Sequence, residues 1–167
     1  MENVSADDLC ICNLSDGSPL TGKKPSVEVG FHAGILRTRP EINVVLHFQT
    51  PCATALASRD SQNINYFVIP EVPYYIGPVA RIPYLAPGSE ELAQAVTDAM
   101  RKHNLVTISN HGQVTAARDL PQAIQNAEFF ELACEIIVHG RDKITSVPEE
   151  YANQLLTLRQ AASNAKI

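Results

Sequence analysis

Apolar and polar positions along this chain follow two alternating patterns, one typical of strands and one typical of helices. Short apolar runs rich in β-branched residues indicate buried strands, and Val44-Val45-Leu46 is the clearest of them. Such runs predict strands over 8–13, 42–47, 65–69, 105–109 and 113–116. Gly112 predicts a tight turn between the last two strands, which leaves His111 projecting from the strand ends.

Helical periods of apolar residues separate the strands, and most of them begin at a residue suited to capping. Helices are predicted from 25–28 to about 37, and over 51–58, 90–103, 121–139 and 148–163. The expected caps are Ser26, Thr50 and Ser89 at the first three N-termini and Gly140 at the end of the fourth helix. Five prolines between Pro70 and Pro87 exclude a long helix there.

Helices that alternate with short strands, with turns joining adjacent strands, predict a layered α/β domain with a mixed or mainly antiparallel sheet. Neither a GxGxxG nor a Walker-type loop occurs, so the usual nucleotide-binding folds lose their support. The 167 residues contain no internal repeat and no long linker. One domain over residues 1–167 is therefore expected.

Composition narrows the classes of partner. A net charge of −5 and a pI near 5.5 argue against nucleic acid or an anionic membrane, and leave a small phosphorylated ligand open. No apolar run approaches the roughly 20 residues of a membrane-spanning helix, and no signal peptide is visible. Cys10 and Cys12 share one side of a predicted strand and cannot easily bond each other. With Cys52 and Cys134 they are interpreted as reduced thiols of a cytosolic protein.

Three residues far apart in the sequence have the chemistry of a metal centre. His47 and His111 each follow the end of a predicted strand, and Glu28 lies in the first turn of a predicted helix. Two imidazoles and one carboxylate make a catalytic zinc set that leaves a position open for water or substrate. Spacing alone leaves a simpler interpretation open, in which each histidine is a hydrogen-bonded structural residue.

Several segments resemble the class II aldolase/adducin family, and they occur in the same order. They are Pro25-Ser26-Val27-Glu28, Phe31-His32, Arg39-Pro40, the strand ending at His47, Ile69-Pro70 with Tyr74, the helix start at 88–92, and Asn110-His111-Gly112. The resemblance covers about residues 5–150 and is closest to the L-fuculose-phosphate aldolases. It implies an α/β/α sandwich around a mainly antiparallel central sheet. It also implies a homotetramer with active sites between subunits, and a divalent metal, usually zinc.

The resemblance further implies retro-aldol cleavage of a keto-sugar phosphate such as L-fuculose 1-phosphate, which gives dihydroxyacetone phosphate and an aldehyde. Glu28 matches the family's proton-transferring glutamate, and His47 and His111 match two of its metal-binding histidines. Tyr74 matches the proton donor to the leaving aldehyde, although covering an apolar edge is its simpler role. Ser26 matches a serine that holds the substrate phosphate. A cation beside the carbonyl would stabilise the charge that this chemistry creates.

Two departures from the family pattern bear on these expectations. Gln49 replaces the second histidine of the family's His-x-His motif, and glutamine is a poor zinc ligand, so weaker metal binding is expected. Val27 replaces a second phosphate-binding serine, and nothing before Asp7 resembles the family's Gly-Asn-x-Ser segment. The chain is therefore expected to be truncated at its N-terminus or to have lost catalysis. The alternative is a non-catalytic module for assembly or binding, as adducin heads are; dehydration or decarboxylation on the same fold also stays open.

Overall fold

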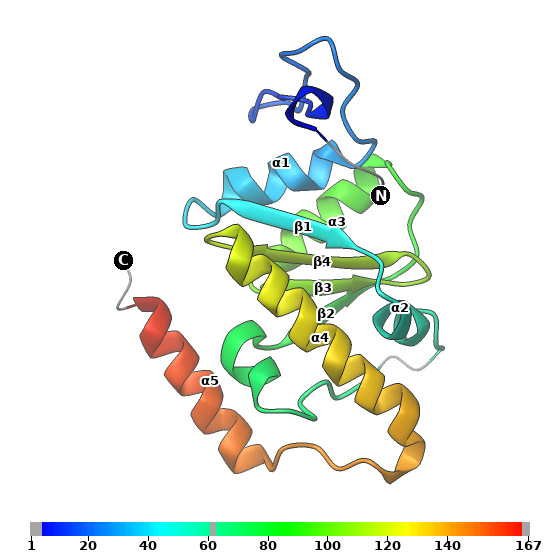
Figure 1. Cartoon of the computed structure of the whole chain (residues 1–167), viewed down its shortest axis with the longest axis vertical. Helices are drawn as coiled ribbons and strands as arrows, with labels where there is room; N and C mark the ends of the chain where they lie inside the picture. Colours follow the sequence, from blue (N-terminus) through cyan, green and yellow to red (C-terminus); the bar gives the residue numbers. More distant parts are fainter. Residues whose placement is uncertain (1–4, 61–62, 165–167) are drawn as a thin grey trace.

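The computed structural model describes residues 5–60 and 63–164, whose helices cover both faces of one four-stranded sheet (Figure 1). The strands are β1 (Val44–Phe48), β2 (Val79–Ile82), β3 (Leu105–Ile108) and β4 (Gly112–Ala117). Their order is β1-β4-β3-β2; β4 pairs antiparallel with both β1 and β3, and β2 pairs parallel with β3. The predicted three-layer sandwich with a mainly antiparallel sheet is thus confirmed, in a mixed form.

The helical layers follow from the alternation of side chains along the central strands. Leu105 and Val106 are both buried, and they belong to cores on opposite faces of the sheet. The core that contains Val106 lies under α1 and α3, and the core that contains Leu105 lies under α2, α4 and η2 (Figure 1). The helices are α1 (Val29–Thr38), α2 (Pro51–Ala57), α3 (Glu90–Met100), α4 (Leu120–Gly140) and α5 (Glu149–Asn164), with short turns η1 (Ala6–Asp8), η2 (Val72–Ile76) and η3 (Arg141–Lys143).

A close contact with α3 sets the position of α1. A side chain at Gly34 would overlap that of Thr97, which is 7% exposed and whose hydroxyl donates to the Ala93 carbonyl at 2.7 Å. Arg39, just past α1, donates to the carbonyl oxygens of Met100, the last residue of α3, and of His103, which follows that helix, at 3.1 and 3.0 Å. Contacts in the middle and at the C-terminal end of α1 therefore fix its position on α3, and with it the position of Glu28 at the helix start.

Helix capping agrees with the sequence at α3 and differs from it at α2. The Ser89 hydroxyl accepts the Leu92 N–H at 3.1 Å, as expected of an N-cap. Thr50 occupies the N-cap position of α2, but its side chain makes no capping hydrogen bond. Glu131, from the distant helix α4, instead accepts the N–H groups of Cys52 and Ala53 at 2.8 and 2.9 Å. A carboxylate supplied by the tertiary fold therefore takes the capping role.

Two of the predicted strands do not form, and one strand was missed. Residues 8–13 contribute only an isolated bridge between Cys12 and Pro19. The segment 65–69 forms no strand, and the Asn65 side chain there accepts the Phe67 N–H at 2.9 Å, a local bond that competes with strand pairing. β2 escaped detection because its four residues lie between prolines and are recognisable as a strand only through pairing with β3.

Two expected caps are wrong, and the expected turn before Gly112 forms with a different residue in the left-handed conformation. The first helix begins at Val29 with Glu28 as its N-cap, and the Ser26 hydroxyl accepts the Glu28 N–H at 3.2 Å one turn earlier. Gly140 is the last residue of α4, and Arg141 follows it with a φ of 52°. In the turn between β3 and β4, the left-handed residue is Asn110, with a φ of 55°, rather than Gly112.

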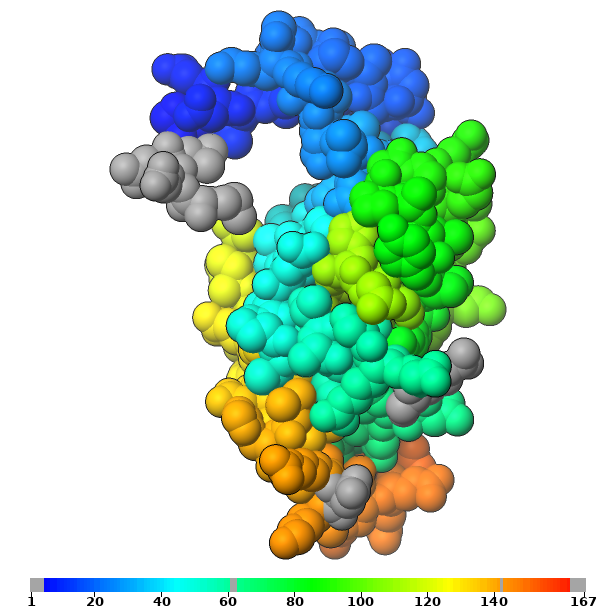
Figure 2. Space-filling view, turned by 90° about the vertical axis from the view of Figure 1, so that its right-hand side faces the viewer, coloured from blue at the N-terminus to red at the C-terminus, as the bar shows by residue number. Residues whose placement is uncertain are grey.

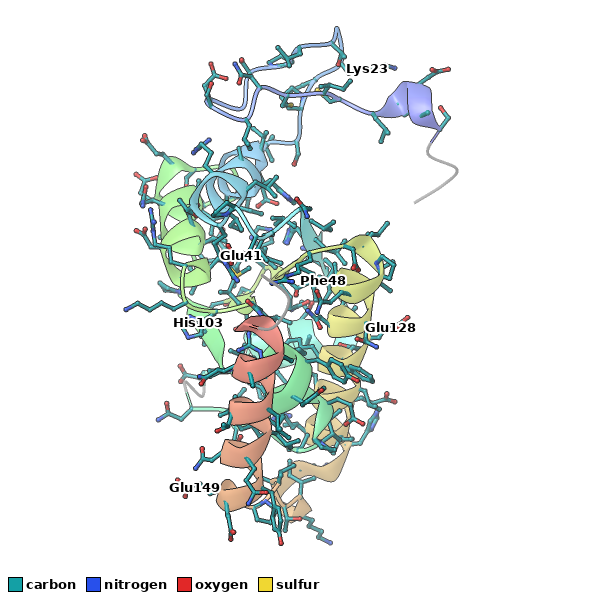
Figure 3. The ribbon with its side chains drawn as sticks, turned by 90° about the vertical axis from the view of Figure 1, so that its left-hand side faces the viewer. Lys23, Glu41, Phe48, His103, Glu128 and Glu149 are labelled. Atoms are coloured by element: carbon teal, nitrogen blue, oxygen red, sulfur yellow. The ribbon has the colours of Figure 1, made fainter. Side chains whose placement is uncertain are left out.

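The N-terminal segment projects beyond α1 as a separate lobe, seen at the top of Figure 2 and on the side that carries Lys23 in Figure 3. Its backbone folds back on itself, because the Leu20 N–H donates to the Ile11 carbonyl at 2.7 Å and the Asn13 N–H to the Ser18 carbonyl at 2.8 Å. Across the described part of the chain, every helix is too short or too polar to cross a membrane.

Candidate metal centre

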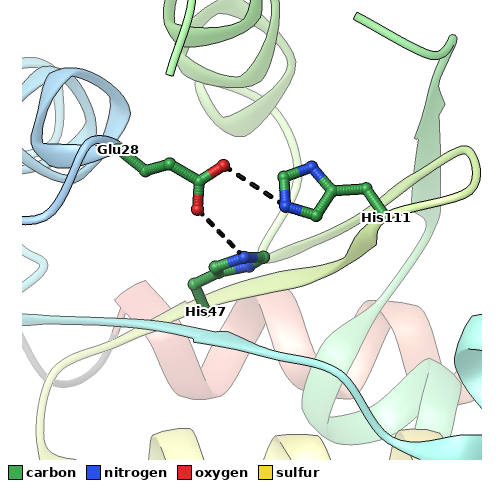
Figure 4. Close-up of side chains that lie close together, drawn as sticks. All are labelled: Glu28, His47 and His111. Carbon is green, nitrogen blue, oxygen red and sulfur yellow. Dashed lines mark ion pairs between the residues drawn. The ribbon is translucent and has the colours of Figure 1, made fainter. Parts of the chain in front are cut away.

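Strand register brings His47 and His111 to the same end of the sheet. His47 pairs with Val114 across β1 and β4, and His111 lies in the turn that precedes β4. The two rings are 5.1 Å apart between centroids and nearly perpendicular, at 86°. Glu28 reaches over them from the start of α1 (Figure 4). Its oxygens lie 3.1 Å from His47 Nε2 and 3.3 Å from His111 Nε2.

Gly112 allows the turn to approach the end of β1 this closely. A Cβ atom at this position would lie 2.8 Å from the Phe48 carbonyl oxygen and 3.1 Å from Cε1 of His47. Gly112 is therefore required for close approach, while Asn110 supplies the turn conformation. The sequence pointed to this glycine for a different reason, and only the pairing of β1 with β4 shows the actual one.

The hydrogen bond on the far side of His47 determines what its ring presents to Glu28. His47 Nδ1 lies 2.9 Å from the carbonyl oxygen of Gln113. Because a carbonyl only accepts, Nδ1 carries the hydrogen, and Nε2 of the neutral ring is an acceptor. That acceptor faces Glu28 Oε2, another acceptor, at 3.1 Å. Either a proton or a metal ion must lie between them.

Burial strengthens the case for a cation. Glu28 is 8% exposed, and among the described residues its Oε1 atom has no hydrogen-bond partner; His111 Nε2, at 3.3 Å, lies outside hydrogen-bond geometry. A buried carboxylate oxygen without a donor is costly. One ligand atom from each of Glu28, His47 and His111 lies within 4.8 Å of the others. Two imidazoles and a carboxylate at this spacing fit a divalent ion such as zinc, with positions left for other ligands.

Gln113 is a contributor that the sequence did not reveal. It is fully buried in β4, and its backbone carbonyl orients His47. With its amide turned to satisfy both neighbours, its side chain donates to the Phe48 carbonyl at 3.2 Å and accepts the Thr54 N–H at 3.3 Å. Gln113 thus holds the end of β1 and the start of α2 around His47. A glutamine in a predicted strand that also contains Val114 and Ala116 was the available signal.

Gln49 and His32 lie next to the centre in supporting roles. Gln49 Nε2 donates to the His111 carbonyl at 2.8 Å, so its amide contacts the backbone of the turn. His32 stacks on Phe31 with ring centroids 4.8 Å apart. Burial, and then repulsion from His47, lower the pKa of His32 to about 4, so its ring is neutral near neutral pH. Gln49 and His32 thus place neutral side chains beside the group formed by Glu28, His47 and His111.

The family resemblance assigned phosphate binding to Ser26 and proton donation to Tyr74. Only Ser26 lies near Glu28. Ser26 is exposed and close to Glu28, through the bond between its hydroxyl and the Glu28 N–H. Tyr74 lies in η2, which packs on the face of the sheet opposite α1, and its ring contacts Tyr75 edge-on at 4.7 Å between centroids. A single chain therefore brings Glu28, His47 and His111 together and holds Tyr74 apart from them.

A hollow of about 300 Å³ lies between the starts of α1 and α3. Glu28 lines it, together with its neighbours 27–31 and with Gly88, Ser89 and Glu90. Because Glu28 also contacts both histidines, the hollow adjoins the candidate centre. The sequence indicated the Gly88-Ser89 helix start as a cap, without showing that it borders a space beside Glu28.

The fold and this centre agree with a family match. Residues 1–138 match the model described as the Class II Aldolase and Adducin N-terminal domain, and the chain belongs to this family. It is 32% identical over 126 residues to the 3-oxo-tetronate 4-phosphate decarboxylase of Escherichia coli O6:H1, which corresponds to 74% of this chain and 59% of that protein.

Two further similarities extend this comparison. The 5-deoxy-D-ribulose 1-phosphate aldolase of Bacillus thuringiensis serovar kurstaki is 33% identical over 135 residues, covering 78% of this chain and 60% of that protein. The crystal structure of YgbL from Klebsiella pneumoniae superposes with a TM-score of 0.86 at 27% identity, over 92% of this chain and 75% of that chain. The chain thus spans about three fifths of the length of the two curated relatives.

Proposed function

We propose that Glu28, His47 and His111 hold a divalent metal ion, zinc in the first instance, and that the protein is a metal-dependent lyase. The observation that supports this most strongly is the approach of His47 Nε2 to Glu28 Oε2 at 3.1 Å, an arrangement of two acceptors that a metal ion or a proton between them would satisfy. His111 Nε2, 3.3 Å from the other carboxylate oxygen, completes a set of ligands for one ion.

The proposed reaction is retro-aldol cleavage of a small keto-sugar phosphate, such as L-fuculose 1-phosphate, to dihydroxyacetone phosphate and an aldehyde. The bound ion would supply positive charge beside the substrate carbonyl, worth several kcal/mol to the transition state. Glu28 can move the proton on the carbon next to that carbonyl, because its two oxygens face different histidines and one can stay near the ion. Gln113 keeps His47 in the ligand orientation.

Phosphate binding and proton donation are assigned to residues outside the ligand set. Ser26 is exposed beside Glu28 and would bind the substrate phosphate, as its family position suggests. Tyr74 lies on the other face of the sheet, so its role as proton donor requires the centre of a neighbouring copy. A homotetramer with shared sites would provide this arrangement. Sedimentation of the chain as a monomer at micromolar concentration would contradict this role for Tyr74.

Decarboxylation is the second candidate reaction, and the similarity to the 3-oxo-tetronate 4-phosphate decarboxylase favours it. Loss of CO₂ from a 3-oxo acid also leaves negative charge beside a carbonyl, so the same ion would serve. Unlike retro-aldol cleavage, it removes no proton from a substrate hydroxyl, and Glu28 would then act only as an acid. The non-catalytic module is the third candidate, and Gln49 in place of a histidine ligand favours it.

One experiment separates the three candidates. The zinc-loaded chain is incubated with L-fuculose 1-phosphate and with 3-oxo-tetronate 4-phosphate, while dihydroxyacetone phosphate and CO₂ are measured. Glu28→Gln is expected to abolish turnover, and His139→Ala, whose side chain is 72% exposed, serves as the matched control. Release of CO₂ alone assigns decarboxylation. Bound zinc without turnover of either substrate contradicts the lyase proposal for this chain and supports the non-catalytic module.

A further inference from the structure

Two cysteine thiols meet on the projecting N-terminal lobe. The Sγ atoms of Cys10 and Cys12 lie 3.6 Å apart, and both side chains are partly buried. The backbone of the lobe holds them on one side, because Ile11, between them, accepts the Leu20 N–H at 2.7 Å and Cys12 forms a bridge with Pro19. The approach of the two sulfurs is therefore built into the fold of the lobe.

A carbonyl oxygen beside the two sulfurs is a third atom that can bind a metal ion. Cys10 Sγ lies 3.1 Å from the carbonyl oxygen of Lys23. Since the carbonyl only accepts, the Cys10 thiol donates to it, and the Cys12 thiol is left to donate to Cys10 Sγ. The two thiol hydrogens thus lie inside a group of two sulfurs and one oxygen. A cation that replaced those hydrogens would find three ligand atoms already gathered.

The distance between the sulfurs distinguishes a metal site from a disulfide. Zinc–sulfur bonds of about 2.3 Å in tetrahedral geometry place two sulfurs about 3.8 Å apart, roughly 0.2 Å more than the spacing seen here. A disulfide bond of about 2.05 Å would require the same atoms to close by roughly 1.5 Å, across a single intervening residue. We propose that Cys10 and Cys12, with the Lys23 carbonyl, form a second metal site for a thiophilic divalent cation such as Zn²⁺ or Cd²⁺.

The chemistry of this site needs no oxidant. Each thiol releases one proton to solvent and forms one sulfur–metal bond, so two protons leave for each ion that binds. Partial burial, and then the neighbouring Cys10 thiol, raise the pKa of Cys12, so protons compete with the metal for this sulfur. The other two cysteines lie away from the lobe, because Cys134 is fully buried in α4 and Cys52 lies in the first turn of α2 beside Glu131.

The second site is separate from the histidine centre in position and in ligand type. The lobe projects beyond α1, as the location of Lys23 in Figure 3 shows, whereas His47 and His111 lie at the ends of sheet strands. Binding would tie residues 10–12 to residue 23 and hold the lobe in one conformation. The two sites can therefore be loaded and removed independently.

Titration of the reduced chain with Cd²⁺ tests the site through the ultraviolet charge-transfer absorption of cadmium thiolates, which histidine ligands do not give. The unaltered chain is expected to show this absorption with one Cd²⁺ per chain. Cys10→Ser and Cys12→Ser singly are expected to lower Cd²⁺ affinity at least tenfold, and the double variant to lose the absorption. Cys52→Ser and His111→Ala are the matched controls and are expected to retain it, whatever happens at the histidine centre.

Undiminished absorption in the double variant overturns the site. A reduced chain that gives no absorption, but whose Cys10–Cys12 peptide loses two hydrogens on treatment with glutathione disulfide, also overturns it and assigns a redox pair instead. Far-ultraviolet circular dichroism of each serine variant shows whether the chain still folds. The exposed position of the lobe makes retention of the native spectrum the expected result (Figure 2).

Discussion

The side-chain amide of Gln49 donates a 2.8 Å hydrogen bond to the carbonyl oxygen of His111, joining the end of β1 to the turn before β4. In the family pattern this position is the second histidine of the His-x-His motif. Here the side chain contacts the backbone that presents His111, so a position expected to bind the ion instead holds one of the proposed ligands. The carboxylate of Glu28, in contact with both imidazoles, is the third ligand in the proposed set.

Restoring the family residue is expected to strengthen metal binding. Gln49→His should raise zinc affinity at least tenfold, equivalent to about 1.4 kcal/mol, because it adds an imidazole ligand beside the proposed centre. Gln49→Ala is the control and should lower affinity, since it removes the bond to the His111 carbonyl without adding a ligand. Competition with a chelator of known affinity measures both. An unchanged affinity in Gln49→His would show that residue 49 does not face the ion.

Removal of His111 is expected to abolish stable zinc binding at the histidine centre. Once His111 is absent, one imidazole and one carboxylate remain, too few ligands to retain the ion through dialysis. Metal content is measured by atomic absorption in a Cys10→Ser, Cys12→Ser background, so that the thiols of the lobe do not contribute. His139→Ala, on the exposed side of α4, is the control. Equal zinc content in the two proteins would rule out this centre.

Substitution of Gly112 is expected to disturb both stability and metal binding. In Gly112→Ala the new methyl group would lie 2.8 Å from the Phe48 carbonyl, so β1 and the turn must move apart. Overpacking of this kind costs about 1–3 kcal/mol. Urea denaturation and zinc titration measure the two effects. Gly22→Ala is the matched control, because a Cβ at Gly22 meets nothing within 4 Å; equal stability of the two variants would contradict the close approach.

The carboxylate of Glu131 is expected to stabilise α2 from a distance. Glu131→Ala removes the acceptor of the Cys52 and Ala53 N–H groups and should lower the free energy of unfolding by about 1–2 kcal/mol. Glu128→Ala, on the exposed side of the same helix in Figure 3, is the control and should change stability little. If both variants unfold at the same urea concentration, Thr50 or solvent caps α2 in place of Glu131.

The sequence by itself predicted most of the strands and helices that depend only on residues close together in the chain. The apolar run at Val44 gave β1, the runs on either side of His111 gave β3 and β4, and Ser89 capped α3 as expected. In these cases the propensity, pattern and capping bonds act within a few residues, so the order of amino acids is sufficient. The sequence also predicted that His47 and His111 lie at strand ends, but it did not show that they contact each other and Glu28.

The tertiary structure decided everything that depends on contacts across the chain. β2 became a strand only by pairing with β3, Glu131 capped a helix some eighty residues before it, and Gly112 proved necessary because β1 passes beside it. The meeting of Glu28 with His47 and His111 has the same origin: it needs the register of β1 on β4 and the packing of α1 on α3. Such contacts join residues that no local pattern relates, and packing geometry alone selects them.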